Sequence, residues 1–228
     1  MTERARQPER LDDLTVSGPE LERTLKELSR LNAWLGNAKA VVGAVQSAVG
    51  DAQEVHIVDV GCGAGDVLRA LADALRLEGR TVTLTGLDGN PSTVAYARAH
   101  LPSATFQVAN VMDPDFTIPP CDVMVCSHLL YHLSDDQAAE FVVRQQPQVR
   151  REIVISELVR SRLARVGFSC LSLVLRTSLW VRQDGHLAIR RSWTQAELER
   201  AMALVPGARV HRTGLFRQLL RVVGTRPT

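Results

Sequence analysis

Apolar residues recur with two different periods along the chain, and the change of period separates the predicted elements. A first amphipathic helix is predicted from Pro19, because leucines recur at steps of three and four residues: Leu21, Leu25, Leu28, Leu31 and Leu35. Gly36 and Asn37 interrupt this helix, and a second apolar run, Ala40–Val49, ends at Gly50. The two helices predict a helical N-terminal unit over residues 19–50, which we expect to cover a ligand crevice.

Short apolar runs then alternate with helical patterns. Strands are predicted at Val55–Val60, Thr81–Leu87, Thr105–Ala109, Cys121–Ser127 and Glu152–Glu157. Helices are predicted between them at Asp66–Leu77, at Ser92–His100 with Ser92 as the cap, and from about Asp135 to Gln145 with Ser134 as the cap. This alternation is typical of βαβ units, so we predict an α/β fold with a Rossmann-like, doubly wound, mostly parallel sheet.

The last third of the chain departs from that alternation. A long, partly apolar stretch, Ser161–Arg182, is followed by a predicted turn at Asp184-Gly185 and a helix starting near Trp193-Thr194. Arg209–Thr213 and Leu215–Val223, split by Gly214, predict a final antiparallel hairpin that completes a seven-stranded sheet. We therefore expect a flexible tail over residues 1–18, a domain over residues 51–228 and a helical lid inserted at about residues 159–205.

Composition narrows the class of protein. With 228 residues, of which 45% are hydrophobic, the chain can bury one sizeable core, and a net charge of +2 argues against nucleic acid as a partner. The four cysteines form no C-x-x-C pair, which favours free thiols in a reducing compartment and predicts no metal site. Residues 1–10 lack the apolar run of a secretory signal, so we expect none, and the longest apolar stretch, around Val166–Val181, is interrupted by Arg176 and is too short to span a membrane. We expect a cytoplasmic monomer or homodimer.

The turn after the first strand carries the clearest chemical signal. Gly61, Gly63 and Gly65 let the backbone approach a ligand closely and turn into a helix whose first N–H groups are free. Asp66 stands where a dinucleotide-binding motif would have its third glycine, and a carboxylate there disfavours a pyrophosphate. Asp88, at the end of the adjacent strand, is placed to accept hydrogen bonds from ribose hydroxyls. The spacing therefore predicts a nucleoside site without a pyrophosphate.

Four segments at successive strand ends resemble the class I S-adenosylmethionine-dependent methyltransferases: Val58–Gly65, Leu87-Asp88, Val108–Val111 and Cys121–Ser127. The resemblance implies that S-adenosylmethionine is the cofactor, with its methionine part against Gly61, Gly63 and Gly65 and its ribose held by Asp88. It implies further that Asn110 and Val111 flank the adenine, that backbone at Cys126 lies near the methionine amino group and that Asp59 organises the glycine turn. Cys62, Gly89 and Asn90 belong to the same two turns and are assigned to this cofactor site.

A wider pattern is similar to bacterial small-molecule methyltransferases of aromatic polyketide and related natural-product pathways. It is carried by Arg30-Leu31-Asn32, Trp34-Leu35-Gly36, Tyr131–Asp135, Glu157–Arg160, Asp184-Gly185 and Arg190-Arg191. Glu157 and Val159 stand where that group tends to have Asp and His, so the resemblance assigns them no direct role.

His132 is our candidate general base, because a neutral imidazole is matched to removing the proton of a phenol. Tyr131 would orient the acceptor. Candidate contacts to the substrate or to the cofactor carboxylate are His128, His186, Arg190, Arg191 and the cofactor-facing Arg30, with Trp34, Trp180 and Trp193 as aromatic walls. For each of these side chains, packing or a solvated surface is the alternative.

These residues predict methyl transfer to a small molecule, most simply O-methylation of a phenolic or polyketide-like acceptor. C-methylation of an indole or quinol ring needs the same cofactor site and stays open. A nicotinamide-dependent oxidoreductase is disfavoured by Asp66, and a non-catalytic nucleoside-binding scaffold by the intact glycines and Asp88. The motif that many base methyltransferases use is absent, since Cys126-Ser127-His128-Leu129 stands in its place.

Overall fold

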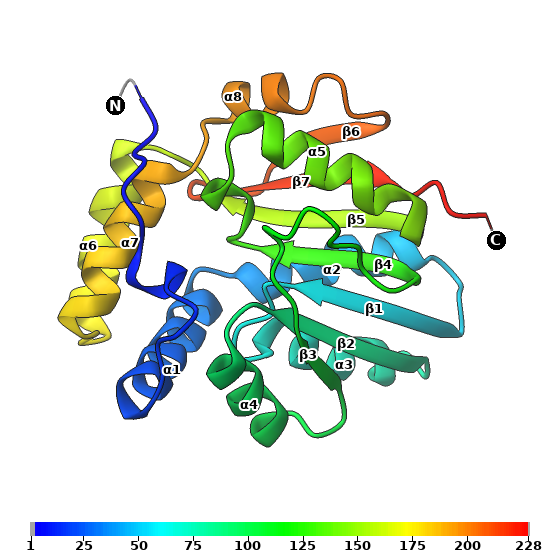
Figure 1. Ribbon diagram of the computed structural model, residues 1–228, viewed down its shortest axis with the longest axis horizontal. Helices are drawn as coiled ribbons and strands as arrows, with labels where there is room; N and C mark the ends of the chain where they lie inside the picture. Colours follow the sequence, from blue (N-terminus) through cyan, green and yellow to red (C-terminus); the bar gives the residue numbers. More distant parts are fainter. Residues whose placement is uncertain (1–2, 228) are drawn as a thin grey trace.

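A seven-stranded sheet, in the order β3-β2-β1-β4-β5-β7-β6, forms the centre of the computed structural model, which describes residues 3–227 (Figure 1). The strands are β1 (Glu54–Val60), β2 (Thr81–Asp88), β3 (Thr105–Val108), β4 (Cys121–Ser127), β5 (Val149–Leu158), β6 (Ala208–Arg212) and β7 (Arg217–Val223). Strands β1 to β5 pair in parallel, and β7 lies antiparallel between β5 and β6. The predicted mostly parallel sheet with a C-terminal hairpin is confirmed.

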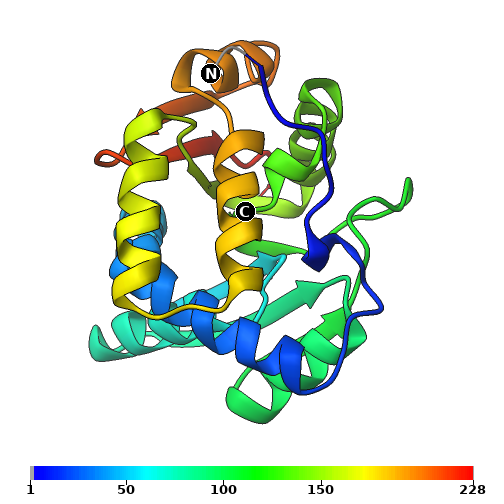
Figure 2. The same cartoon turned by 90° about the vertical axis from the view of Figure 1, so that its left-hand side faces the viewer.

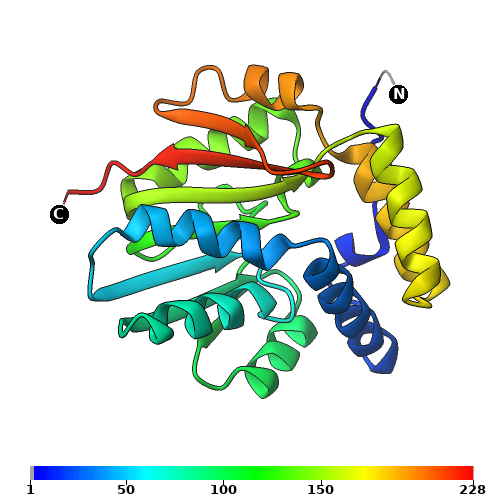
Figure 3. The same cartoon turned by 180° about the vertical axis from the view of Figure 1, so that it is seen from behind.

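Helices cover both faces of the sheet (Figures 1 and 3). Buried apolar side chains of α2 (Asn37–Val49), α3 (Asp66–Leu77) and α4 (Pro91–His100) pack on one face. Those of α5 (Asp135–Gln145) and α8 (Gln195–Ala201) pack on the other. Because the central strands are buried on both sides, they read in the sequence as continuous apolar runs. The predicted Rossmann-like, doubly wound fold is confirmed.

Local capping fixes where the helices begin. Ser134 caps α5 as predicted, by accepting a hydrogen bond from the N–H of Gln137. The prediction that Ser92 caps α4 is wrong: the side-chain oxygen of Asn90 accepts from the N–H groups of Ser92 and Thr93. Pro91 occupies the first turn, where its missing N–H costs nothing, so the helix begins one residue earlier than predicted.

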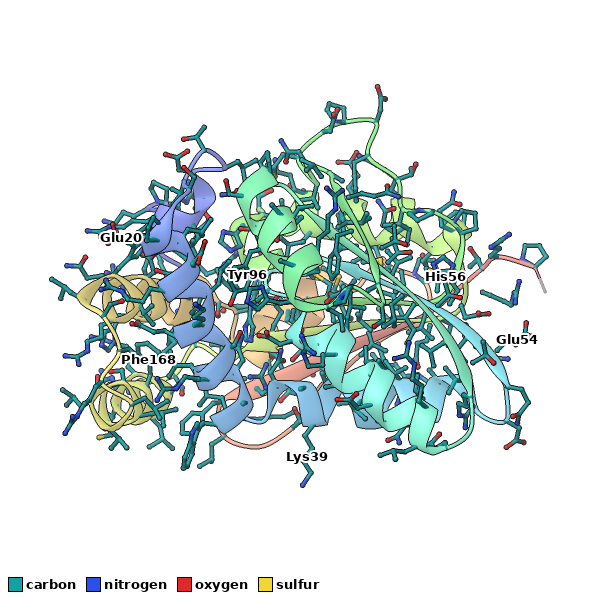
Figure 4. The ribbon with its side chains drawn as sticks, turned by 90° about the horizontal axis from the view of Figure 1, so that it is seen from below. Glu20, Lys39, Glu54, His56, Tyr96 and Phe168 are labelled. Atoms are coloured by element: carbon teal, nitrogen blue, oxygen red, sulfur yellow. The ribbon has the colours of Figure 1, made fainter. Side chains whose placement is uncertain are left out.

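Three helices gather at the carboxyl ends of the parallel strands: α1 (Pro19–Trp34), α6 (Arg162–Val174) and α7 (Leu179–Arg191) (Figure 2). The turn predicted at Asp184-Gly185 is wrong, because both residues lie inside α7. A Cβ at Gly185 would lie 2.1 Å from the ring of Phe168, so the glycine allows α6 and α7 to pack closely. Figure 4 shows Phe168 at one end of the molecule and Glu54, where β1 begins, at the other.

The segment before α1 contacts the rest of the protein. The sequence predicts a flexible tail here, whereas the structure places residues 3–16 alongside α7 and over the strand ends, with a short 3₁₀ helix, η1 (Arg10–Asp12) (Figure 2). Residues 1 and 2 of the predicted tail lie outside the described residues. No helix within residues 3–227 combines the length and the apolar character needed to cross a bilayer.

Candidate functional site

A cavity of about 620 Å³ opens at the carboxyl ends of β1, β2, β3 and β4, beneath α1, α6 and α7. This volume is within the usual range for small-molecule sites, and the crevice outside the strand ends is where open α/β sheets bind ligands. The cavity has a polar end formed by the strand-end loops and an apolar end formed by the helices. We call these the loop end and the helix end.

The loop end brings together most of the residues predicted to bind the cofactor. Eight of them line it: Gly61, Cys62, Gly63, Asp88, Gly89, Asn90, Asn110 and Val111. The carboxylate of Asp88 accepts hydrogen bonds from the backbone N–H of Gly63 at 3.1 Å and of Asn90 at 3.0 Å. Asp88 therefore ties the glycine turn to the neighbouring strand end.

Carboxyl groups dominate the electrostatics of the loop end. Asp59, Asp66 and Asp88 all line it, and burial raises the pKa of each; for Asp59 the other two carboxylates raise it further. A cation bound here would relieve this repulsion between like charges. The loop end is thus suited to a positively charged ligand.

Several buried polar atoms at this cavity lack a partner. Among the described residues, no hydrogen bond reaches Oγ1 of Thr24, Oδ1 of Asp59, Oγ of Ser127 or Nδ1 of His128, although all four side chains line the cavity. An unsatisfied buried polar group costs free energy, so these atoms indicate a ligand that supplies donors and acceptors.

The helix end is walled by apolar side chains and closed by one polar cluster. The wall comes from α1, α6, α7 and the segments beside them: Leu28, Leu31, Leu35, Leu158, Phe168, Val181, Ile189 and Phe216. The polar cluster consists of Glu9, Asp12, Tyr131, His132 and Arg191, all of which line the cavity. An apolar molecule with one polar group matches this arrangement.

Tyr131 and His132 lie side by side in that cluster. Their rings stack with centroids 4.3 Å apart, and the Tyr131 hydroxyl donates to Oε2 of Glu9 at 3.3 Å. Burial, with Glu9 nearby, raises the pKa of Tyr131 well above its usual value, so this hydroxyl stays protonated. Nδ1 of His132 lies 2.7 Å from Oδ1 of Asp12.

His128 also lines the cavity, in a left-handed backbone conformation with φ of 57°. Its Nε2 lies 3.3 Å from the Arg217 guanidinium, which also donates to Asn37 and Ser156. Burial and the adjacent positive charge lower the pKa of His128 well below its usual value. This imidazole is therefore neutral at physiological pH.

Six residues that the sequence predicts for the site do not line the cavity: Arg30, Gly65, Cys126, Trp34, His186 and Arg190. Arg30 and Arg190 are exposed, and Trp34, at the end of α1, is 70% exposed. His186 packs against Phe168 between α6 and α7. Their helical periods leave these side chains facing away from the cavity.

The other two belong to the core beneath the site. Cys126 is fully buried, and the next residue, Ser127, reaches the cavity in its place. Gly65 faces Phe106, whose ring lies 3.1 Å from where a Cβ would stand. Trp180 and Trp193, the other predicted aromatic walls, are buried in packing and do not line the cavity either.

Sequence reasoning missed Glu9, Asp12 and Asp184, which line the helix end. Glu9 and Asp12 lie before Pro19, in a segment whose sequence has neither a helical nor a strand period. Asp184 belongs to a pair, Asp184-Gly185, that favours a turn. The one hint is the pair of leucines, Leu11 and Leu14, that interrupts the polar tail and lines the cavity.

Glu157, on β5, supports the site from below. It is fully buried, and its Oε1 accepts from the N–H of Leu129 at 3.1 Å and of Leu130 at 2.9 Å. These are the residues that lead into Tyr131 and His132. Burial raises the pKa of Glu157 to about 8, against the opposing effect of the two N–H donors.

Replacing Glu157 with glutamine should flatten the pH dependence of stability. Between about pH 4.5 and pH 8 the folded protein holds a proton on Glu157 that the unfolded chain has released, so the free energy of unfolding falls as the pH rises. Between pH 5.5 and 8.5, we expect the free energy of unfolding of the wild type, measured in urea, to fall by at least about 1.4 kcal/mol more than that of Glu157→Gln. This difference corresponds to one pKa unit. Glu199→Gln, at an exposed position, should follow the wild type, and equal slopes in all three proteins would contradict the prediction.

Comparison with known proteins agrees with this architecture. Residues 57–147 match a family described as "Methyltransferase domain". A trans-aconitate 2-methyltransferase of Delftia acidovorans is 43% identical over 60 residues, which are 26% of this chain and only 21% of that protein. The matched part is therefore a small share of that relative.

Solved structures share the fold over most of the chain. A plantazolicin methyltransferase, BpumL, crystallised with a desmethylplantazolicin analogue and SAH, has a TM-score of 0.63 at 14% identity and covers 88% of this chain and 90% of that one. Human N-acetylserotonin methyltransferase, in complex with SAM, has a TM-score of 0.59 at 17% identity over 90% of this chain and 56% of that one. Residues 57–147 therefore match a methyltransferase domain, and the chain as a whole has the Rossmann-like fold of these S-adenosylmethionine-dependent methyltransferase structures.

Proposed function

We propose that the protein transfers a methyl group from S-adenosylmethionine to the hydroxyl oxygen of an uncharged, apolar acceptor such as a phenolic or polyketide-like natural product. The observation that supports this most directly is the continuity of the cavity. One space joins the glycine turn and Asp88 to the side chains of Tyr131 and His132.

The residues of the loop end fit the cofactor. Asp88 would hold the ribose, Asn110 and Val111 would flank the adenine, and the unpartnered Oδ1 of Asp59 offers an acceptor to the methionine part. Buried carboxylates favour a ligand that carries a sulfonium and an ammonium group. When bound, the cofactor supplies an electrophilic methyl group whose transfer leaves a neutral thioether.

The charges of the helix end favour an uncharged acceptor. Arg191 is the one Arg or Lys among the described residues that line the cavity, and it is engaged by Asp12 at 2.7 Å and Glu9 at 3.4 Å. A carboxylate-bearing acceptor would therefore find no free Arg or Lys side chain there among residues 3–227. The name of the Delftia relative implies such an acceptor, so we do not extend its substrate to this protein.

His132 would remove the proton from the acceptor, because it is the ring at the helix end with a nitrogen available to accept. Tyr131, held neutral beside it, would orient the acceptor oxygen. The apolar wall would position the ring and exclude water, which a displacement at a methyl carbon requires.

The first test compares the binding of the cofactor to the wild type and to Asp88→Ala. Calorimetry should give micromolar binding of S-adenosylmethionine and S-adenosylhomocysteine to the wild type. We expect at least about tenfold weaker binding to Asp88→Ala, because the change removes a ribose acceptor and the tie to Gly63. Asp51→Ala, at an exposed position before β1, should bind as the wild type does.

Other outcomes would overturn parts of the proposal. Absence of binding of either ligand would refute the cofactor assignment, and binding of NADH in their place would favour an oxidoreductase. With binding established, methyl uptake is measured for phenols, indoles and quinols. Transfer to a ring carbon alone would refute O-methylation.

A further inference from the structure

The N-terminal segment and the site meet at Asp12. One carboxylate oxygen accepts from Nδ1 of His132 at 2.7 Å, and the other accepts from Arg191 at 2.7 Å and from the N–H of Glu9 at 3.0 Å. Asp12 and His132 are far apart in the chain, so this contact exists only when the segment lies over the cavity.

The contact determines which ring nitrogen carries the proton. Burial would raise the pKa of Asp12, but the hydrogen bonds from His132 and Arg191 outweigh it and lower the pKa to about 2. An ionised carboxylate only accepts hydrogen bonds, so Nδ1 must be the protonated nitrogen of the neutral ring. The lone pair then lies on Nε2, to which no protein group bonds within residues 3–227, and the ring lines the cavity.

Arg4 anchors the start of the segment next to the same loop. Its guanidinium donates to three backbone carbonyl groups: those of Tyr131 at 3.1 Å, Leu133 at 3.0 Å and Arg191 at 2.8 Å. It also lies 3.9 Å from the ring centroid of Trp193, where a cation–π contact is favourable. The segment is thereby fastened to the residues on both sides of His132.

The other end of the segment reaches the loop end of the cavity. The side chain of Asn90 donates to the carbonyl of Val16 at 2.9 Å, and Leu14 lies 3.0 Å from where a Cβ of Gly89 would stand. Between these anchors, the backbone N–H of Arg10 donates to Asp184 of α7 at 3.2 Å. The segment therefore spans both ends of the cavity.

We propose that Asp12 is the positioning residue for His132, and that docking of the N-terminal segment assembles the acid–base pair at the same time as it covers the cavity. This rests on the proposed function. In the reaction the acceptor O–H proton moves to Nε2 as the oxygen forms its bond to the methyl carbon and the electron pair of the broken C–S bond stays on sulfur. Asp12 then balances the positive charge of the imidazolium.

Other charged groups are already matched around His132. Arg191 of α7 shares its charge between Asp12 and Glu9, Glu9 accepts from Tyr131, and Arg4 is paired with Asp135. His128, the other ring on this side, is held neutral by burial and by Arg217. Asp12 is thus the carboxylate that contacts the imidazole directly.

The ring nitrogens of His132 give a test that needs no acceptor. In ¹⁵N NMR spectra of the complex with S-adenosylhomocysteine, assigned by the signals missing from His132→Gln, wild-type His132 should be the Nδ1–H tautomer. Asp12→Asn should shift His132 toward the Nε2–H tautomer, because an amide can donate to Nδ1. Asp13→Asn removes the same charge from the neighbouring residue, whose side chain accepts hydrogen bonds from Thr15, and should keep the wild-type tautomer.

Turnover gives the second readout. With the phenol that is methylated fastest, kcat of Asp12→Asn should fall at least about tenfold, with KM and the Kd of S-adenosylhomocysteine within about twofold of the wild type. An Nε2–H tautomer in the wild type, or unchanged kcat in Asp12→Asn, would overturn the role of Asp12. Failure to bind S-adenosylhomocysteine, or to methylate any phenol, would instead refute the proposed function.

Discussion

Replacing His132 with alanine is expected to lower kcat for a phenolic acceptor by about 10²–10⁴-fold, the range that a positioned general base contributes. The ring lines the helix end of the cavity, and its Nδ1 is bound by Asp12, so alanine removes the nitrogen that would accept the phenolic proton. The Kd of S-adenosylhomocysteine should stay within about twofold of the wild type, since the residues of the loop end are untouched. Steady-state kinetics and calorimetry on the same preparations measure both quantities.

Comparing two phenols of different pKa distinguishes a general base at His132 from a side chain that only shapes the pocket. A phenol that is already ionised at the assay pH needs no base, so the deficit of His132→Ala should shrink when such a phenol replaces an un-ionised one. His211→Ala, at an exposed position on β6, should leave kcat unchanged for both. An equal loss with both phenols would mean that His132 shapes the pocket only.

The sheet could be predicted from the sequence because its central strands are buried on both faces. The run Cys121–Ser127 was predicted with the bounds that the structure has, as was the helix Asp66–Leu77, whose apolar face packs on the sheet. Local signals and tertiary packing agree in these elements. The four strand-end motifs follow from the same agreement, since parallel strands bring their carboxyl ends to one edge.

Helices α6 and α7 could not be predicted to the same extent, because long-range contacts override the local signals of their sequences. Asp184-Gly185 is a common turn pair, yet Trp180 donates to Asp184 at 3.0 Å, and Phe168 fills the space beside Gly185. Packing between α6 and α7 therefore stabilises a helix through a sequence that alone favours a turn.

The same reason explains why Glu9 and Asp12 were missed. Asp12 and Glu9 lie in a polar stretch without a period, and their position depends on Tyr131, His132 and Arg191, more than a hundred residues away. No local signal in the sequence encodes such contacts. The sequence offered both Arg190 and Arg191 as candidates, and one helical step, about 100°, decides that Arg191 lines the cavity and Arg190 does not.

Two glycines of the core have a role that the motif alone does not reveal. A Cβ at Gly86 of β2 would lie 2.5 Å from Cδ1 of Phe106, and one at Gly65 would lie 3.1 Å from the same ring. Phe106, on β3, is 2% exposed and fills the space that both side chains would need. Gly86 also faces Cys62 of the glycine turn, at 2.9 Å from the Cβ position to Sγ.

Gly86→Ala is therefore expected to destabilise the protein by about 1–3 kcal/mol in urea unfolding, the usual cost of overpacking, and to weaken binding of S-adenosylhomocysteine through Cys62. Gly43→Ala is the matched control: Gly43 is exposed on α2 with nothing within 4 Å of the Cβ position, so alanine should stabilise the helix by about 0.5–1 kcal/mol. In the double variant with Phe106→Leu the ring is gone, so the cost of the alanine should fall by at least about 1 kcal/mol in a double-mutant cycle. If the changes in the free energy of unfolding are additive, the Phe106 ring does not cause the cost of alanine at position 86. The cost would then come from the contact with Cys62 in the glycine turn.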